Sequence, residues 1–244
     1  MLRKPAISRY DEGDDDMRKS IALLSFVICL FAADAADAGW SGPAELISGR
    51  WGSGKGQFGI RTEGGFEVLP AIGAITNDEN VVIRDAVNKK QLIFNGKGAL
   101  SSEVKWDAAR GQGENAIAAI PHKDREAETA LAQRMAVNVY QVTVVFPDRN
   151  VVVTSDTEFK RAMRDRHGNV YGFTPELVLG FDKNGKQTGT LNLPASHEEL
   201  VTIPGQPARG MYVIYGEPVV GPSGSIYLTK KTDTGFAVLK WTWK

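Results

Sequence analysis

Cysteine is nearly absent from this chain, since Cys29 is the only one among 244 residues. A single thiol excludes an intramolecular disulfide, a multi-thiolate metal site and a CxxCH haem attachment. Histidine is scarce too, and His122, His167 and His197 show no metal-ligand spacing. No G-x-S-x-G nucleophile elbow occurs either. Without disulfides, the fold must rest on its apolar core.

Long apolar runs are also missing, apart from the twelve residues Ile21–Ala32. Arg18 and Lys19 precede this run, and two A-x-A cleavage sites follow it within 33–38. This order is typical of a secretory signal peptide, and the run is shorter than the roughly 20 residues of a membrane-spanning helix. We expect 17–38 to be a signal peptide that directs the protein to the periplasm or the cell exterior.

The residues before Met17 are polar and include Asp14–Asp16, which is not what precedes a signal peptide. We therefore expect translation to start at Met17, and we interpret 1–16 as a misannotated N-terminal extension.

Neither sign of charge dominates the remaining chain. Residues 1–38 hold five of the 29 basic and seven of the 29 acidic residues, so 24 basic and 22 acidic residues remain. A net charge of +2 gives no reason to expect binding to nucleic acid or to an anionic membrane surface. About 205 residues suffice for one sizeable domain, which we expect over 39–244.

Four short segments share one pattern, in which apolar residues enter a polar turn and a β-branched or aromatic strand follows. Asn, Asp and Gly accept positive φ in such turns, and the flanking residues favour strands. We therefore predict β-hairpins at 75–85, 144–156, 163–173 and 219–230. In the first and third, a further strand and turn follow. One unit is thus two successive hairpins, close to a four-stranded antiparallel sheet.

Three stretches together resemble an NHL-type repeat: Gly52–Gly59 (GSGKGQFG), the hairpin 75–85, and Asn88–Asn95 (NKKQLIFN). The family pattern runs from G-x-G-x-G-x-F through a D-x-x-G-N-I-Y-V-x-D hairpin to N-x-R-I-x-x-F, and the match is best over 52–100. The chain departs from it at Glu79, where Asp or Gly is usual. The resemblance implies an all-β fold, a β-propeller of four-stranded blades.

The number of blades follows from the length, because about 205 residues at 40–45 per blade give four or five. Three arrangements stay open: a compact propeller, an incomplete ring closed by a second subunit, and a stacked β-sandwich. Strand propensity continues to the C-terminus, and we predict that the last strand pairs with Ala44–Ser48. We expect the core to include Val82, Ile93, Phe94, Tyr171, Phe181 and Tyr227.

The segment Lys123–Met135 (KDREAETALAQRM) breaks the strand pattern. Ala127, Leu131 and Met135 recur every four residues, and Pro121 just ahead is a helix-start signal. We expect one short surface helix inserted between the sheets.

Candidate binding residues lie near the mature N-terminus and in the glycine-rich loop: Trp40, Trp51 and Lys55. The resemblance also extends to propeller hydrolases of the lactonase type, which hold calcium or zinc on Glu, Asn and Asp side chains. In that alternative, Asn80, Asp85 and Glu217 would supply oxygen ligands.

We expect an exported, non-catalytic, propeller-like protein without a cofactor, which binds another protein, an envelope component or a ligand. Two alternatives stay open: a metal-dependent hydrolase of the lactonase type, and a structural subunit of a cell-envelope assembly. The expected protein is a monomer or small homo-oligomer with no membrane span after signal cleavage, and no catalytic residue can be assigned.

Overall fold

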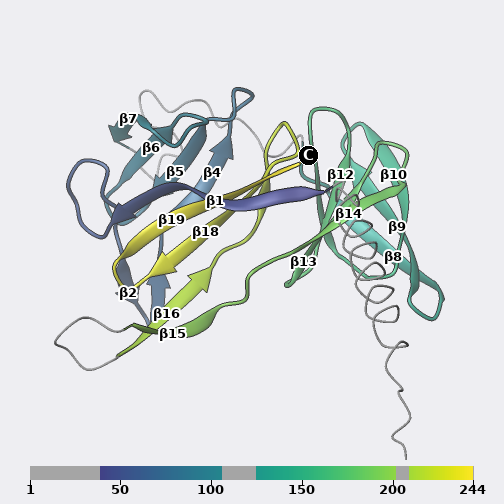
Figure 1. The fold of residues 1–244 in the computed structure, drawn as a ribbon. Coiled ribbons are helices and arrows are strands. Elements are labelled where there is room, and N and C mark those ends of the chain that lie inside the picture. Colours follow the sequence, from purple (N-terminus) through teal and green to yellow (C-terminus); the bar gives the residue numbers. More distant parts are fainter. Residues whose placement is uncertain (1–38, 106–124, 202–208, 244) are drawn as a thin grey trace, which may run out of the picture. The chain divides into compact units, whose positions relative to one another are not determined.

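Strands make up the regular structure in the computed structural model, which describes residues 39–105, 125–201 and 209–243. The nineteen strands form several antiparallel sheets (Figure 1), and no closed barrel or propeller is detected among them. Within these ranges there is no helix of the length and apolarity needed to cross a membrane. The all-β class expected from the sequence is confirmed. The expected signal peptide at 17–38 and the extension at 1–16 lie outside the described residues.

Two sheets are built from the repeated unit of two hairpins, and their strand order follows the chain, as the repeat predicts. The first consists of β4 (Ala71–Ile75), β5 (Val81–Asp85), β6 (Lys90–Phe94) and β7 (Leu100–Lys105). The second consists of β11 (Arg161–Arg164), β12 (Val170–Phe173), β13 (Leu177–Phe181) and β14 (Gln187–Asn192). The hairpins predicted at 75–85 and 163–173 are confirmed as β4–β5 and β11–β12.

A third sheet has three strands in the order β10-β9-β8. They are β8 (Thr129–Ala136), β9 (Val139–Phe146) and β10 (Arg149–Ser155). The pair β9–β10 is the hairpin predicted at 144–156. In contrast, β8 shows that the helix predicted over 123–135 is wrong, because the described part of that segment ends in a strand.

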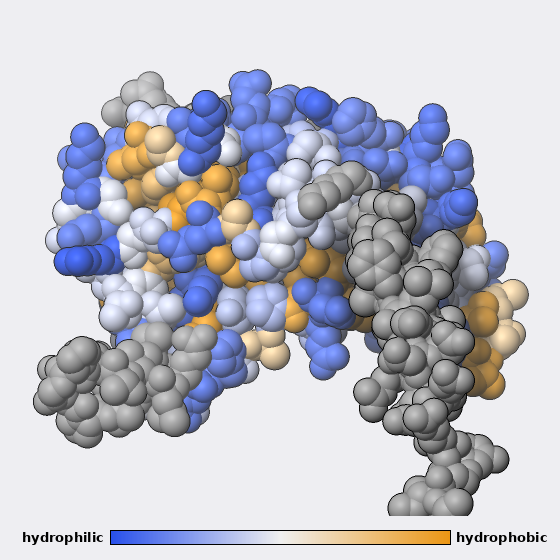
Figure 2. Space-filling view, viewed as in Figure 1, coloured by the Kyte–Doolittle hydropathy of each residue, from blue (hydrophilic) through white to orange (hydrophobic). Residues whose placement is uncertain are grey.

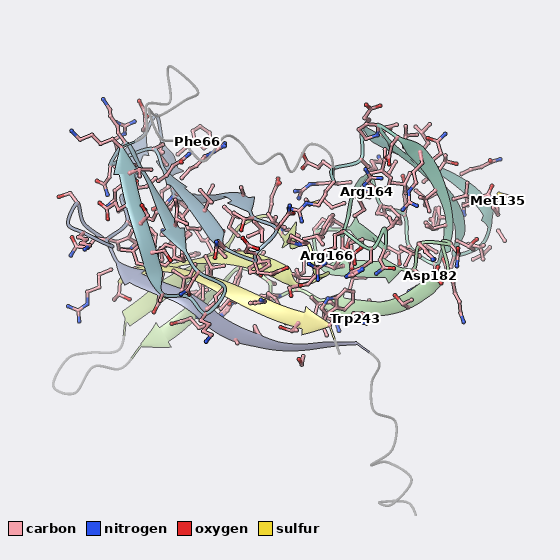
Figure 3. The ribbon with its side chains drawn as sticks, turned by 90° about the horizontal axis from the view of Figure 1, so that it is seen from above. Phe66, Met135, Arg164, Arg166, Asp182 and Trp243 are labelled. Carbon is pink, nitrogen blue, oxygen red and sulfur yellow. The ribbon has the colours of Figure 1, made fainter. Side chains whose placement is uncertain are left out.

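Two features explain why a strand forms where a helix was predicted: the spacing of the apolar residues and the pairing of β8 with its neighbour. Residues four apart share a face of a strand as well as of a helix, so the spacing did not distinguish the two. β8 pairs with β9, which places Ala130 opposite the buried Val144 and turns it toward the core. Leu131 and Met135 are instead 63% and 57% exposed. Met135 points away from the sheets in Figure 3, and apolar residues reach the surface at that end of the molecule (Figure 2).

The last large sheet joins the first and last described strands. Its order is β1-β19-β18-β16-β15, and β17 also pairs with β18. Its strands are β1 (Trp40–Arg50), β15 (His197–Val201), β16 (Arg209–Tyr215), β17 (Val219–Val220), β18 (Ile226–Thr232) and β19 (Gly235–Trp243). β17–β18 is the hairpin predicted at 219–230. A separate small hairpin consists of β2 (Arg61–Glu63) and β3 (Phe66–Val68).

β1 and β19 form the pairing predicted between the two ends of the domain. They run antiparallel, with Ala44 opposite Lys240 and Ser48 opposite Ala237. The prediction that the last strand pairs with Ala44–Ser48 is therefore confirmed.

Five hairpins share one turn geometry. In each, the amide of the fourth turn residue donates to the carbonyl oxygen of the first, and the fourth residue has a positive φ. Glycine, which adopts positive φ without a steric penalty, occupies that position in four turns: Gly98, Gly168, Gly185 and Gly224. In the β4–β5 turn the position belongs to Glu79, with a φ of 61°. A residue other than glycine in this conformation destabilises the fold by roughly 1–2 kcal/mol, so contacts of the Glu79 side chain must offset that cost.

The sheets bury two main apolar clusters. One joins residues of β4–β7, β11–β14 and β17–β19, among them Phe94, Tyr171 and Tyr227. The other lies between β8–β10 and β11–β14 and includes Phe146 and Phe181. Because the β11–β14 sheet contributes to both clusters, it is covered on both faces. All six residues predicted to lie in the core are buried.

Candidate binding site around Arg161

Strands β4, β11 and β17 come together at Arg125. Its guanidinium donates hydrogen bonds to the carbonyl oxygens of Ile75 on β4, at 3.0 Å, and Val220 on β17, at 3.2 Å. Its own carbonyl oxygen accepts a hydrogen bond of 2.8 Å from the amide of Arg164 on β11. One residue therefore ties three sheets together.

Arg161 stands at the other end of β11 and is held by three groups. Its Nη1 lies 3.1 Å from a carboxylate oxygen of Glu217, and its Nη2 lies 3.5 Å from one of Glu126. Its guanidinium carbon lies 5.1 Å from the centre of the Phe173 ring, a cation–π contact. Two carboxylates around one guanidinium leave this cluster with a net negative charge.

The ion pair between Arg161 and Glu217 is weak enough for a ligand to replace one of its partners. The Glu217 side chain is 83% exposed, and exposed pairs contribute at most about 1 kcal/mol. A charged group of a ligand can therefore displace either partner at little cost.

Arg161 borders two adjoining hollows, with volumes of about 700 and 500 Å³. Both are also bounded by Tyr215, Gly216 and Glu217. Most of the wall of the larger one, which we call the Arg161 hollow, is apolar or aromatic and includes Phe173, Pro175, Leu193, Pro194, Pro218 and Leu228. Such a wall with a few charged groups is typical of ligand sites of this size.

Local packing places Arg161 at this position. A Cβ at Gly172 would lie 2.7 Å from the ring of Phe159, so glycine is needed there for the ring to fit. Phe159 is buried and anchors the segment that leads into β11. Phe173, the next residue along β12, faces the opposite side of the strand. There it is the register partner of Arg161, which accounts for the cation–π contact.

The aromatic candidates from the sequence are half-buried. Trp40 donates its indole N–H to the carbonyl oxygen of Gly224 at 3.3 Å, and its ring meets that of Trp243 edge-on at 4.4 Å. Trp51 donates its indole N–H to the carbonyl oxygen of Thr232 at 2.9 Å. These bonds fasten β1 and the loop after it to the last sheet. Trp40 also borders a hollow of about 450 Å³.

Trp51 and Lys55 border two further hollows, of about 880 and 520 Å³. Glycine, serine, threonine and charged residues form most of the wall at Trp51. The hollow at Lys55 has a single apolar wall residue, Leu100. Both offer a ligand less apolar surface than the Arg161 hollow does.

The structure does not bring the three candidate metal ligands together. Asn80 directly precedes β5 and Asp85 is its last residue, which places them about 17 Å apart along the strand. The buried Asp85 carboxylate accepts hydrogen bonds from the amides of Gly59 and Asn88, and Glu217 pairs with Arg161. Among the described residues, no three His, Cys, Asp or Glu side chains are grouped as a metal site requires.

Sequence reasoning did not find Arg161, Phe173 or Tyr215. The available signal was that Phe173 ends the hairpin predicted at 163–173 and Arg161 lies two residues before it, where antiparallel pairing would place the two opposite each other. Nothing in the local sequence indicated that a hollow lies beside that pair.

The chain matches no protein-family model and no curated protein. The case for its function therefore rests on the site geometry and on the residues that resemble an NHL-type repeat.

Proposed function

We propose that the mature chain is an exported, non-catalytic binding protein of the cell envelope, and that it holds a ligand or protein partner at the Arg161 hollow. The observation that carries the proposal is the hollow itself, with about 700 Å³ of space, apolar walls and charged groups of both signs. The exchangeable ion pair of Arg161 and Glu217 supplies a polar contact without a large desolvation cost.

We further propose that the four-stranded runs are blades of a propeller-like array. Two arrangements support this. The run β17-β18-β19-β1 combines the last strands with the first one, which is how a ring of blades is closed. Arg125 ties β4, β11 and β17, each of which starts such a run, as the inner strands of neighbouring blades would be tied.

The non-catalytic part of the proposal rests on where the perturbed side chains lie. Burial raises the pKa values of the Tyr171 and Tyr227 hydroxyls, and the neighbouring carboxylates of Asp165 and Glu79 raise them further. Neither tyrosine borders the Arg161 hollow or the hollow next to it. These tyrosines stay protonated donors inside the fold, so their role is structural.

Mild purification from the native envelope tests the proposal. Material bound to the tagged mature protein is identified by mass spectrometry, for the wild type, for Arg161→Ala, and for Glu63→Ala. Glu63 is an exposed carboxylate on β2 that does not border the hollow. We expect one bound species with the wild type and the Glu63 variant, and its loss with Arg161→Ala. Equal recovery from all three proteins would contradict a role for the Arg161 hollow.

Elemental analysis of the same wild-type sample distinguishes the metal-dependent hydrolase alternative from a non-catalytic binding protein. One stoichiometric calcium or zinc ion per chain would favour the lactonase-type reading. We expect no metal to co-purify in that ratio, because Asn80 and Asp85 lie at opposite ends of β5.

A further inference from the structure

The Arg161 hollow adjoins the hollow beside Trp40. These two share Leu193, Pro194 and Tyr215, and the second has a volume of about 450 Å³. The hollow of about 500 Å³ next to Arg161 also has Tyr215 in its wall, so the three hollows adjoin one another around this residue. We call this set of adjoining hollows the Tyr215 groove.

Several contacts restrain Tyr215, which all three hollows share. Its backbone is fixed by pairing with Lys230 and by the hydrogen bond of 3.1 Å from its amide to the Ser196 hydroxyl. Its ring stacks on that of His197, with 6.3 Å between the ring centres. A fixed aromatic ring loses little entropy on binding, which favours its use as a contact for apolar ligand groups.

The parts of the groove differ in charge. Among the described residues, no charged one borders the part beside Trp40, whose wall includes Pro43, Leu239 and Trp241. The described residues that border the two parts beside Arg161 include five carboxylates and three cations, a net charge of −2. The part beside Trp40 is therefore uncharged, and the parts beside Arg161 are acidic.

Two of these carboxylates carry the excess charge. Glu67 pairs with Lys231, whose ammonium lies 2.7 Å from it, and Glu158 pairs with Lys160 at 3.8 Å. Glu126 and Glu217 share the single charge of Arg161. The exposed Glu176 side chain pairs with no cation among the described residues. Glu176 and Glu217 are thus the carboxylates that a ligand cation can reach.

We propose that the Tyr215 groove binds an extended peptide segment that carries a lysine or arginine next to apolar residues. The basic side chain lies between Glu176 and Glu217, and the apolar side chains lie against Tyr215, Leu193 and Trp40. Arg161 holds the carboxylate of Glu217 at the hollow, so the loss of Arg161 also removes this acidic contact. In an extended chain, every second side chain points the same way about 7 Å further on, so one peptide supplies groups to successive hollows. The inference rests on the proposed function and specifies the ligand class.

Panning of a displayed random-peptide library on the mature protein tests the inference. The wild type is compared with Glu176→Lys, Glu217→Gln and the charge-matched control Glu63→Lys, each checked for a cooperative thermal transition. We expect wild-type selections to enrich basic residues beside apolar ones. We also expect each groove variant to bind a labelled selected peptide about threefold to fivefold more weakly at low salt, and the Glu63 variant to bind it normally.

Three outcomes would overturn the inference: no enrichment on the wild type, enrichment of acidic peptides, or selected peptides that bind the groove variants and the wild type equally. None of these outcomes removes the proposed function. If envelope material still depends on Arg161 while no peptide is selected, the site binds a ligand of another class. If neither experiment detects binding, the proposed function fails as well.

Discussion

The carboxylate of Glu79, in the turn between β4 and β5, accepts a hydrogen bond from the hydroxyl of Tyr227 on β18, 148 residues further along the chain. Its other oxygen accepts a hydrogen bond of 2.9 Å from the amide of Ser223, and the Lys240 ammonium lies 3.6 Å from the oxygen that Tyr227 contacts. These contacts explain why a side chain is kept at a turn position where four equivalent turns have glycine. Glu79 fastens the first complete four-stranded sheet to the last sheet.

The Glu79 contacts predict a stability that depends on pH. Burial by itself would raise the pKa of Glu79, but hydrogen bonds from Tyr227 and Ser223 and the charge of Lys240 outweigh it and lower the pKa below 4.5. A carboxyl group with a lowered folded-state pKa contributes stability above its ordinary pKa and loses it as the pH falls. We expect the wild type to lose more stability than Glu79→Gln between pH 5 and pH 3.

Urea unfolding at each pH measures this difference. At pH 7, Glu79→Gln should lower the free energy of unfolding by about 1.5–3 kcal/mol, the range for hydrogen bonds to a charged group. Parallel pH profiles of the two proteins would show that the carboxylate contributes nothing.

Substitutions at Phe94 and Phe181 test how much each of the two apolar clusters contributes to stability. Both side chains are buried, one in each cluster. Truncation of either to alanine should lower the free energy of unfolding by roughly 3–5 kcal/mol. Denaturant unfolding checks this, with Phe66→Ala on β3 as a control, because Phe66 is 80% exposed (Figure 3). A loss below about 1 kcal/mol at both buried sites would contradict the core described above.

The pairing of β1 with β19 predicts the effect of a C-terminal truncation. Removal of 236–244 leaves β1 without its partner and removes Phe236, Val238 and Trp241 from the core. We expect the whole domain to unfold cooperatively, as seen by circular dichroism and by exposure of apolar surface. A soluble truncated protein that still melts in one sharp transition would show that this pairing is dispensable.

The hairpins and the end-to-end pairing were predictable because their signals are local or simple. At 163–173, a turn with Asp and Gly is followed by Val170 and Tyr171, which favour a strand, and this local pattern predicts a hairpin. The last strand needed a partner, and a short apolar segment near the mature N-terminus was available at Ala44–Ser48.

The remaining features depend on contacts that no local pattern contains. Leu131 and Met135 have a spacing that suits a helix and a strand equally, and only the presence of β9 decides between them. Trp40 is half-buried because Gly224 and Trp243 lie beside it. The groove at Tyr215 exists only where residues from separate sheets border the same space, so the sequence could not reveal it.

Export predicts the N-terminus of the native protein. If Met17 is the start and 17–38 is removed, protein from the native envelope begins near Gly39. N-terminal sequencing and intact mass check this. Recovery of the protein from the cytoplasm with Met1 retained would contradict both the start site and the signal peptide.

Photocrosslinking in the native envelope tests the central claim, binding at the Arg161 hollow, most directly. A photoreactive residue replaces Pro175, which is exposed at the rim of the hollow. The matched control replaces Thr62 on β2, which is also exposed but does not border the hollow. We expect one discrete adduct from position 175, its disappearance when Arg161 is also changed to alanine, and no such adduct from position 62. An equal yield of adducts at both positions, or none at position 175, would contradict the account.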